Sequence, residues 1–379
     1  GILENENELN VIIKQTVREQ GQAGGEDTLR HQVQYFGYGW DFSTRLVGIG
    51  IHRDVYLLHE NIKLEDIYFV PSIMGIKGKI HFSAFISEET ELRFDIWLDE
   101  NKIHSYEFKV KHNIGVDLWV DNIKRWYPNG EGNPQLYRVE IFISEDQSWV
   151  MHSRFNVGFK SIRYLKNVGS KEALPYTIEI NDKKIWIKGI CITNFDQMVG
   201  RVTSEDYRFY VKAMKEMNVN LVRLWGGGIK ESYQFYNECD RQGIMVWQDF
   251  YQSQSSSKGL ASQDSFFMKE LSQSAIETIK ELRNHISTVI YCGGNELKDE
   301  NMVPLTTLHP NLMMLERLVL NLNPQVLFYP TTPSGPNFSY TSDQNHHTNH
   351  NIHGPWTFID GYFDYYNQGD WLFQGEFGV

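Results

Sequence analysis

The sequence lacks the features of a membrane-spanning or nucleic-acid-binding protein. No run approaches the ~18 consecutive apolar residues that a membrane-spanning helix requires. The formal net charge of -12 would repel a phosphate backbone, and no cluster of Lys and Arg provides an exception. We therefore expect neither a membrane nor a nucleic acid as a partner, and a neutral or cationic small ligand fits this charge better.

Cysteine is scarce. The chain has 3 Cys, and Cys191, Cys239 and Cys292 lack metal-ligand spacing and lie in or beside apolar stretches. We interpret them as buried free thiols. Residues Gly1 to Leu3 provide neither the basic nor the apolar segment of a secretory signal, so no signal peptide is expected. The sequence leaves the compartment and the oligomeric state open.

The remaining composition is typical of a multidomain globular protein. Hydrophobic residues account for 41% and charged residues for 22% of the 379 residues, a length that favours two or three domains. Aromatic content is 14%, with 10 Trp and 20 Tyr. Flat amphipathic rings suit stacking on sugars, although the large aromatic cores of β-rich domains account for most of them.

The first part of the chain has the pattern of β-sandwiches. Short β-like runs at 9–13, 32–36 and 54–58 are separated by turn residues and predict part of one sandwich over residues 1–62. A second set of alternating strands predicts a small immunoglobulin-like sandwich over residues 63–168. The strands expected there are 80–86, 91–98, 104–110, 136–143 and 150–157.

After Ala173 apolar strands alternate with amphipathic helices. The expected strands are 185–192, 220–225, 244–250, 288–292, 325–329 and 371–373. The expected helices are 204–217, where Ser204 could cap, 232–242, 266–284 and 311–322. Strands that alternate with helices form parallel β/α units, and their number favours a (β/α)8 TIM barrel over residues 169–379 rather than an open sheet.

Two glutamates follow two of these predicted strands. Glu296 ends the segment Gly293-Gly294-Asn295-Glu296, and Glu376 lies between Gly375 and Phe377. Both should lie on the barrel face where the strands end, which is where such barrels carry out chemistry. Cleavage of a glycosidic bond needs one carboxyl to protonate the departing oxygen and one carboxylate to stabilise or trap the oxocarbenium-like centre. The pair therefore predicts a glycoside hydrolase.

Several motifs occur in order along nearly the whole chain. They are Tyr38 to Asp41, Trp126 to Gly132, Val222 to Trp247, Arg283 to His285, Cys292 to Glu296, His353 to Trp356 and Gly375 to Gly378. Together they resemble glycoside hydrolase family 2, and within it the β-mannosidase branch. The resemblance implies the C-terminal part of a jelly-roll domain, an immunoglobulin-like sandwich, and a barrel without its last strand.

The resemblance also implies a mechanism. It predicts a retaining hydrolase with a covalent glycosyl-enzyme intermediate, in which Glu296 is the acid/base and Glu376 is the nucleophile. Attack without an intervening water requires the two carboxyls to lie roughly 5 to 5.5 Å apart. No cofactor is needed for this chemistry.

Five further residues correspond to sugar contacts of the family. The resemblance implies that Asn295 hydrogen-bonds the sugar 2-hydroxyl, a contact that strengthens in the transition state. It implies that Trp225 forms a wall of the pocket and that Asp41, with Trp40, binds the non-reducing end. Trp356 would flank the leaving-group side. The implied ligand is a β-linked oligosaccharide or glycoside.

Charged residues near the pair have more open interpretations. Arg223 should lie inside the barrel near carboxylates, where holding the pKa of the nucleophile low and simple structural pairing are equally compatible with the sequence. Asp249 is similar. The histidines between 346 and 353 are not interpreted as a metal site, because the implied mechanism needs no metal, and His353 alone is predicted to contact the sugar.

Three functional hypotheses follow. The first is an exo-acting β-mannosidase. The second is another specificity of the same family, namely exo-β-glucosaminidase, β-galactosidase or β-glucuronidase; Glu at position 296 favours the mannosidase branch over the glucosaminidase branch, in which Asp is expected. The third is a non-catalytic carbohydrate-binding fragment, against which the presence of both carboxylates argues.

Overall fold

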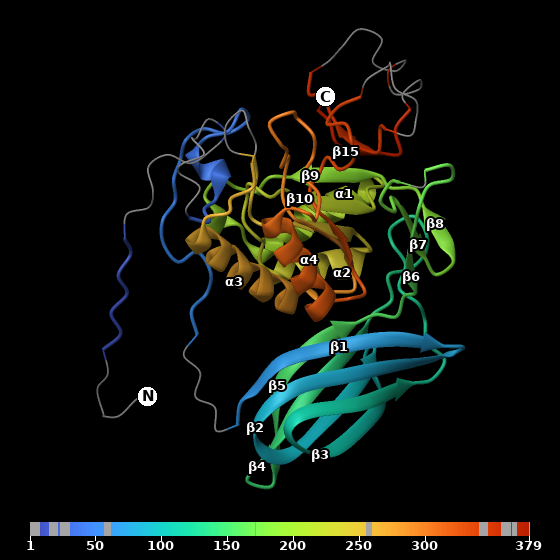
Figure 1. Ribbon diagram of the computed structural model, residues 1–379. Coiled ribbons are helices and arrows are strands. Elements are labelled where there is room, and N and C mark those ends of the chain that lie inside the picture. Colours follow the sequence, from blue (N-terminus) through green and yellow to red (C-terminus); the bar gives the residue numbers. More distant parts are fainter. Residues whose placement is uncertain are drawn as a thin grey trace.

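The computed structural model describes residues 8–14, 22, 31–56, 62–170, 172–254, 260–340, 348–357, 365 and 370–378. They form a β-sandwich, a small antiparallel sheet and a β/α unit, with the N-terminal segment beside the β/α unit (Figure 1). Within these residues, no helix combines the length and the apolar character needed to cross a membrane.

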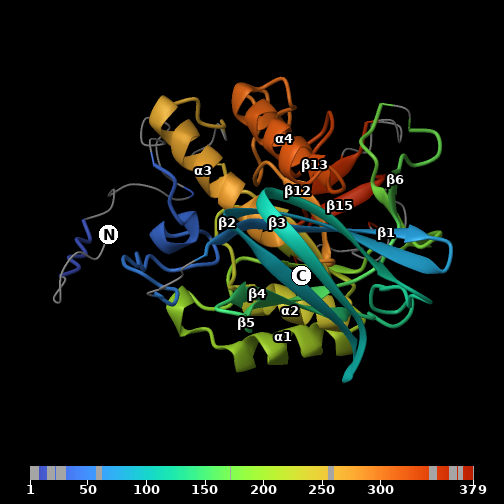
Figure 2. The same cartoon turned by 90° about the horizontal axis from the view of Figure 1, so that it is seen from below.

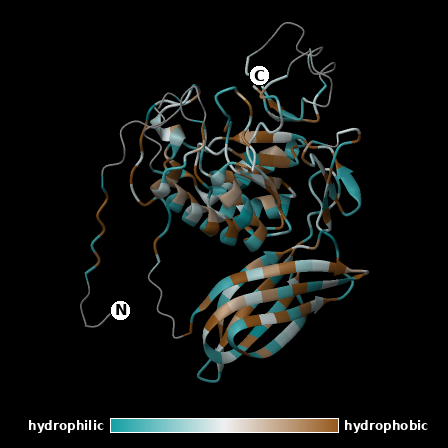
Figure 3. Cartoon of the chain, viewed as in Figure 1, coloured by the Kyte–Doolittle hydropathy of each residue, from teal (hydrophilic) through white to brown (hydrophobic). Residues whose placement is uncertain are grey.

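The sandwich is one antiparallel sheet folded onto itself. Its strands are β1 (Leu64–Met74), β2 (Lys77–Leu98), β3 (Asn101–Val120), β4 (Tyr137–Glu145) and β5 (Ser148–Val157). The register of the long strand β2 shifts between Ile86 and Thr90. Its first half pairs with β1 and its second half with β4, and the rings of Phe82 and Phe94, one in each half, are 4.8 Å apart between centroids. Apolar and polar bands alternate along these strands (Figure 3), so one face of each layer is buried.

The predicted strands divide the sandwich differently from the observed ones. The predicted strands 80–86 and 91–98 are the two halves of β2, and strand β1 was not predicted. Pro71 explains the omission, because a proline argues against a central strand. Strand β1 pairs with β2 alone, and an edge strand tolerates proline.

A small sheet connects the sandwich to the β/α unit. It contains β6 (Ile162–Leu165), β7 (Thr177–Ile180) and β8 (Lys183–Ile185). Ile178, Ile180 and Ile185 share a buried cluster with Leu221 and Met245, which begin two strands of the β/α unit. The predicted strand 185–192 is therefore wrong as a single element: β8 ends at Ile185 and β9 begins at Gly189, because β8 pairs back onto β7.

The β/α unit contains parallel strands in chain order. Strands β9 (Gly189–Ile192), β10 (Leu221–Leu224), β11 (Met245–Asp249), β12 (Thr288–Cys292) and β13 (Leu327–Tyr329) form one sheet, and β14 (Asn351–His353) pairs in parallel with β15 (Phe373–Glu376). Helices α1 (Ser204–Glu216), α2 (Tyr233–Gln242), α3 (Ser265–Leu282) and α4 (Pro310–Leu322) lie around the outside (Figure 2). Thr203, rather than Ser204, caps α1, in a capping box with Asp206.

The N-terminal strand predictions are wrong. Residues 9–13 are extended but unpaired, 35–38 form a 3-10 helix, and 54–56 are irregular, while 57 and 58 lie outside the described residues. A strand requires a neighbour for its backbone hydrogen bonds, and the strand pairings among the described residues include none of these runs; Leu9 is 82% exposed. The described part of residues 1–62 thus contains no named strand, and the predicted jelly-roll domain over this range stays a prediction.

Candidate active site

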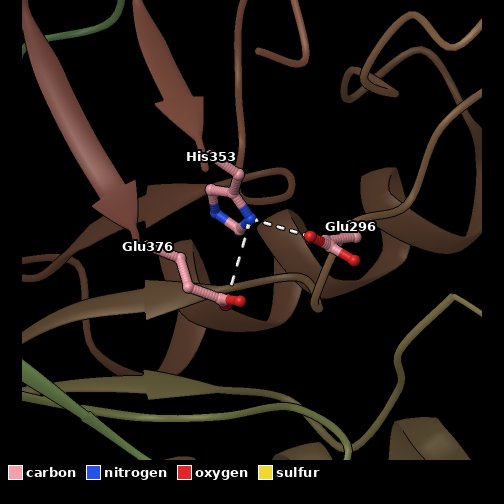
Figure 4. A group of neighbouring side chains, drawn as sticks. All are labelled: Glu296, His353 and Glu376. Carbon is pink, nitrogen blue, oxygen red and sulfur yellow. Dashed lines mark hydrogen bonds and ion pairs between the residues drawn. The ribbon is translucent and has the colours of Figure 1, made fainter. Parts of the chain in front are cut away.

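Charged and polar side chains converge where the parallel strands end. Arg223 lies in β10, Asp249 ends β11, Asn295 and Glu296 follow β12, His353 ends β14, and Glu376 ends β15. One carboxylate oxygen of Glu296, one of Glu376 and a ring nitrogen of His353 all lie within 4.8 Å of one another. Figure 4 shows the ring of His353 between the two carboxylates. The fold thus brings the two predicted glutamates together from segments 80 positions apart in the numbering (376 minus 296).

Glu376 is held as an anion. Arg223 Nη1 donates to its Oε2 at 2.8 Å, and Trp356 Nε1 donates to its Oε1 at 3.1 Å. Burial raises the pKa of the Glu376 carboxyl, but the electrostatic interactions with His353 and Arg223, with the hydrogen bonds from Trp356 and Arg223, outweigh burial and lower the pKa below its ordinary value. Glu376 is therefore ionised at neutral pH.

Arg223 connects three acceptors in the interior. Its side chain is 3% exposed, and its Nη2 donates to Asp249 Oδ2 and to Asn295 Oδ1, both at 2.7 Å. Burial lowers the pKa of Arg223, but Asp249, Cys191 and Glu376 raise it well above its ordinary value. Both roles that the sequence left open are present: Arg223 pairs with buried Asp249 and also holds the pKa of Glu376 down.

Gln254 and His353 contact the carboxylate of Glu296. Gln254 Nε2 donates to its Oε2 at 2.5 Å, and His353 Nδ1 lies 3.0 Å from its Oε1. The backbone of Glu296 has φ +53°, a left-handed conformation that is uncommon for a residue with a side chain. Its amide donates to the carbonyl of Thr332 at 2.8 Å, which fixes this turn against the segment after β13.

The aromatic and N-terminal residues form a separate group. Trp225 is buried, and the rings of Trp40 and Phe42 pack edge-on against it at 4.9 and 5.5 Å. A side chain at Gly227 would meet the Trp225 ring at 2.0 Å, so this glycine permits the ring to lie across the loop. Asp41 is exposed, and its Oδ2 accepts a hydrogen bond from Gln22. Trp40 thus packs on the ring of Trp225, whereas Asp41 forms hydrogen bonds with Gln22.

The structure also changes the interpretation of the histidines and cysteines. His353 is fully buried, and its nitrogens are bonded to Glu296 and Thr332, so it acts within the protein rather than as the predicted sugar contact. His346 and His347 lie outside the described residues. Cys239 and Cys292 are buried free thiols as expected, whereas Cys191 is only half-buried.

Two residues of the site were not predicted from the sequence. The side chain of Gln254 contacts the Glu296 carboxylate directly, and the side chain of Thr332 is linked to that carboxylate through His353. Gln254 follows β11 and Thr332 follows β13. Treating every polar residue after the end of a parallel strand as a candidate would therefore have identified both.

Comparison with known proteins identifies the family. The model of the TIM barrel domain of glycosyl hydrolases family 2 matches residues 175–318, and a second model of glycosyl hydrolases family 2 matches residues 63–160. The chain belongs to glycosyl hydrolases family 2. These matches confirm the predicted fold class of β-sandwich and TIM barrel, and they place the chain in a family of glycoside hydrolases.

Relatives of this family 2 chain include β-mannosidases. Beta-mannosidase B of Aspergillus terreus is 26% identical over 273 residues, which cover 70% of this chain and 31% of that protein. The structure of a β-D-mannosidase from Dictyoglomus thermophilum is similar with a TM-score of 0.76 at 24% identity, covering 92% of this chain and 44% of that one. A β-glucuronidase from Parabacteroides merdae has a TM-score of 0.57 at 15% identity, covering 78% and 34%. The chain thus spans less than half the length of each.

Proposed function

We propose that the protein is a retaining exo-β-glycosidase that removes terminal β-linked mannose from oligosaccharides. The observation that carries this proposal is the close approach of Glu296 and Glu376, whose nearest oxygens lie within 4.8 Å. Retaining glycosidases place their carboxyls about 5 to 5.5 Å apart, whereas inverting enzymes need about 6.5 to 9.5 Å to hold a water between them. The spacing favours direct attack by one carboxylate.

The hydrogen-bond partners distinguish the roles of the two glutamates. The guanidinium of Arg223 and the indole N–H of Trp356 can donate but cannot accept, so their bonds to Glu376 favour a permanent carboxylate. A carboxamide such as that of Gln254 offers both a donor and an acceptor, so Glu296 can change protonation without losing this partner. This asymmetry supports Glu376 as nucleophile and Glu296 as acid/base.

The proposed reaction has two steps. Glu376 attacks the anomeric carbon while Glu296 gives its proton to the glycosidic oxygen, which departs with the electron pair of the broken C–O bond. Glu296 then takes a proton from water, whose oxygen attacks the same carbon and releases Glu376. Two inversions at one carbon retain the β configuration.

The sugar is inferred from the relatives and from the implied pocket. Relatives of this chain are named β-mannosidases, and we infer the same terminal sugar here. We propose that Asn295, which is bonded to Arg223 at 2.7 Å, presents its amide to the 2-hydroxyl. Trp225 would form the wall of the pocket with Trp40, Asp41 would bind the non-reducing end, and Trp356 would flank the leaving group.

The test is hydrolysis by the complete protein of a panel of aryl β-glycosides. We expect the mannoside to be preferred over the glucosaminide, galactoside and glucuronide, and the first product seen by NMR to be β-mannose. Glu376→Ala should abolish turnover, whereas Glu300→Ala, at an exposed glutamate, should leave it unchanged. A preference for another sugar would overturn the specificity, and normal activity of Glu376→Ala would overturn the mechanism.

A further inference from the structure

A chain of buried hydrogen bonds leads from β14 to Glu296. Asn351 Nδ2 donates to Thr332 Oγ1 at 3.0 Å, Thr332 Oγ1 lies 2.9 Å from His353 Nε2, and His353 Nδ1 lies 3.0 Å from Glu296 Oε1. Figure 4 shows the last of these links. Asn351, Thr332 and His353 are each 0% exposed, so bulk water does not compete for these bonds.

The donors and acceptors give this chain one direction. The amide N–H of Asn351 can only donate, so Thr332 Oγ1 accepts that bond. Thr332 Oγ1 has one hydrogen to donate, and among the described residues its other hydrogen-bond partner is His353 Nε2. If Oγ1 also accepted from Nε2, its own hydrogen would have no acceptor there, so the hydroxyl donates and Nε2 accepts. A neutral imidazole that accepts at Nε2 carries its hydrogen on Nδ1. The His353 ring consequently donates to Glu296 Oε1.

The opposite direction would require Asn351 to turn its amide over. In the present orientation the buried Asn351 Oδ1 has no hydrogen-bond partner. Turning the amide would place an NH2 group with two hydrogens at that position, and buried N–H groups without acceptors are rarer than buried oxygens without donors. Gly375 leaves space for this arrangement, because a Cβ there would lie 2.5 Å from both Asn351 Oδ1 and Thr332 Oγ1.

We propose that Thr332 and Asn351 are positioning residues that fix the hydrogen of His353 on Nδ1, so that Glu296 carries its acid proton on Oε2. This inference rests on the proposed glycosidase function. With Oε1 accepting the ring N–H, the acid proton is left to Oε2, which also accepts a hydrogen bond from Gln254. In the first step the O–H bond at Oε2 breaks, its electron pair stays on Glu296, and the proton joins the glycosidic oxygen.

The experiment compares Thr332→Val and Thr332→Ser in the complete protein. Valine keeps the shape but removes the hydroxyl, whereas serine keeps the hydroxyl. Because one directional hydrogen bond is lost, we expect Thr332→Val to lower kcat/KM about tenfold on an alkyl β-mannoside, with little change on an activated dinitrophenyl β-mannoside. Thr332→Ser should restore the alkyl rate.

Thr331→Val is the matched control. Thr331 is equally buried, but its hydroxyl donates to the carbonyl of Gly294 and accepts from the amide of Leu297. A substitution at either threonine that only disturbs the structure should reduce kcat/KM equally for both substrates. The inference would be overturned if Thr332→Val lowered kcat/KM equally for the two substrates, or if Thr332→Ser failed to restore the alkyl rate. Either result would leave the glycosidase function intact. A wild-type protein inactive on both substrates would instead refute the proposed function and the inference with it.

A second measurement reads the tautomer in the wild-type protein itself. The ¹⁵N NMR signals of the His353 ring, assigned by their loss in His353→Gln, distinguish the two tautomers. We expect Nδ1 to carry the hydrogen in the wild-type protein. A ring with its hydrogen on Nε2 would overturn the proposed direction of the chain.

Discussion

Arg223 offers the sharpest test of how the site controls Glu376. Its guanidinium reaches Glu376, Asp249 and Asn295 simultaneously at 2.7 to 2.8 Å. The substitution Arg223→Lys keeps the positive charge but replaces a planar fork with one ammonium on a shorter stem, which cannot serve three acceptors in these directions. We expect the ammonium to stay with buried Asp249 and to release Glu376.

The expected effect has both a size and a direction. Loss of a hydrogen bond to a charged group costs about 1.5 to 3 kcal/mol, which corresponds to a decrease of roughly 10- to 100-fold in kcat/KM. Arg223 is one of the groups that hold the pKa of Glu376 below its ordinary value, so its removal raises that pKa. Activity requires the ionised nucleophile and is lost as the pH falls through this pKa. The acidic limb of the pH profile should therefore move to higher pH.

The assay is kcat/KM for an aryl β-mannoside measured across the acidic limb. Arg283→Lys is the control: its side chain is 5% exposed and bonds Asp66 at 2.7 Å, which joins the sandwich to the end of α3. Arg283 precedes β12, whereas Glu296 follows it. We expect Arg283→Lys to lower the free energy of unfolding without shifting the acidic limb of the pH profile. An unchanged acidic limb in Arg223→Lys would refute the argument that Arg223 keeps Glu376 ionised.

Three further predictions concern other positions. Glu296→Gln should slow alkyl β-mannosides far more than activated aryl β-mannosides, because only the former need a proton on the departing oxygen; equal losses would contradict the acid role. Gly227→Ala would place a methyl carbon 2.0 Å from the Trp225 ring, so the ring must move and KM should rise more than kcat falls. Burial lowers the pKa of Lys160 from 10.5 to about 7. Between these pH values the unfolded chain therefore binds more protons than the folded chain, so the midpoint of urea unfolding should rise with pH across this range. Lys160→Met should flatten that rise.

The sequence predicts the barrel elements well because their signals are local. The four predicted helices match α1 to α4 with small shifts at their ends, since each combines an apolar stripe with a terminal signal, such as Asp264 at the start of α3. Strand β14 was missed because Asn351-Ile352-His353 is short and mostly polar. The strand predictions for the N-terminal runs were wrong because their signal is not sufficient locally. An apolar run forms a strand only where a partner strand exists.

The candidate site was predicted in part for similar reasons. Glu296 and Glu376 could be identified because each follows or ends a strand beside glycines. Gln254, Thr332 and Asn351 could not, because a neutral polar side chain has no distinctive chemistry until its neighbours are known. Their importance comes from contacts between segments that are distant in sequence.

The backbone around Glu296 explains why those distant contacts matter. Asn295 forms isolated parallel bridges to Ser253 on one side and to Thr332 on the other, so the segment after β12 continues the sheet between the segments after β11 and β13. The same two neighbouring segments provide Gln254 to Oε2 and, through His353, Thr332 to Oε1. The backbone that places Glu296 therefore also places the groups that orient its carboxyl. A change in either neighbouring segment should alter acid/base catalysis first, because Glu376 receives its hydrogen bonds from Arg223 in β10 and from Trp356.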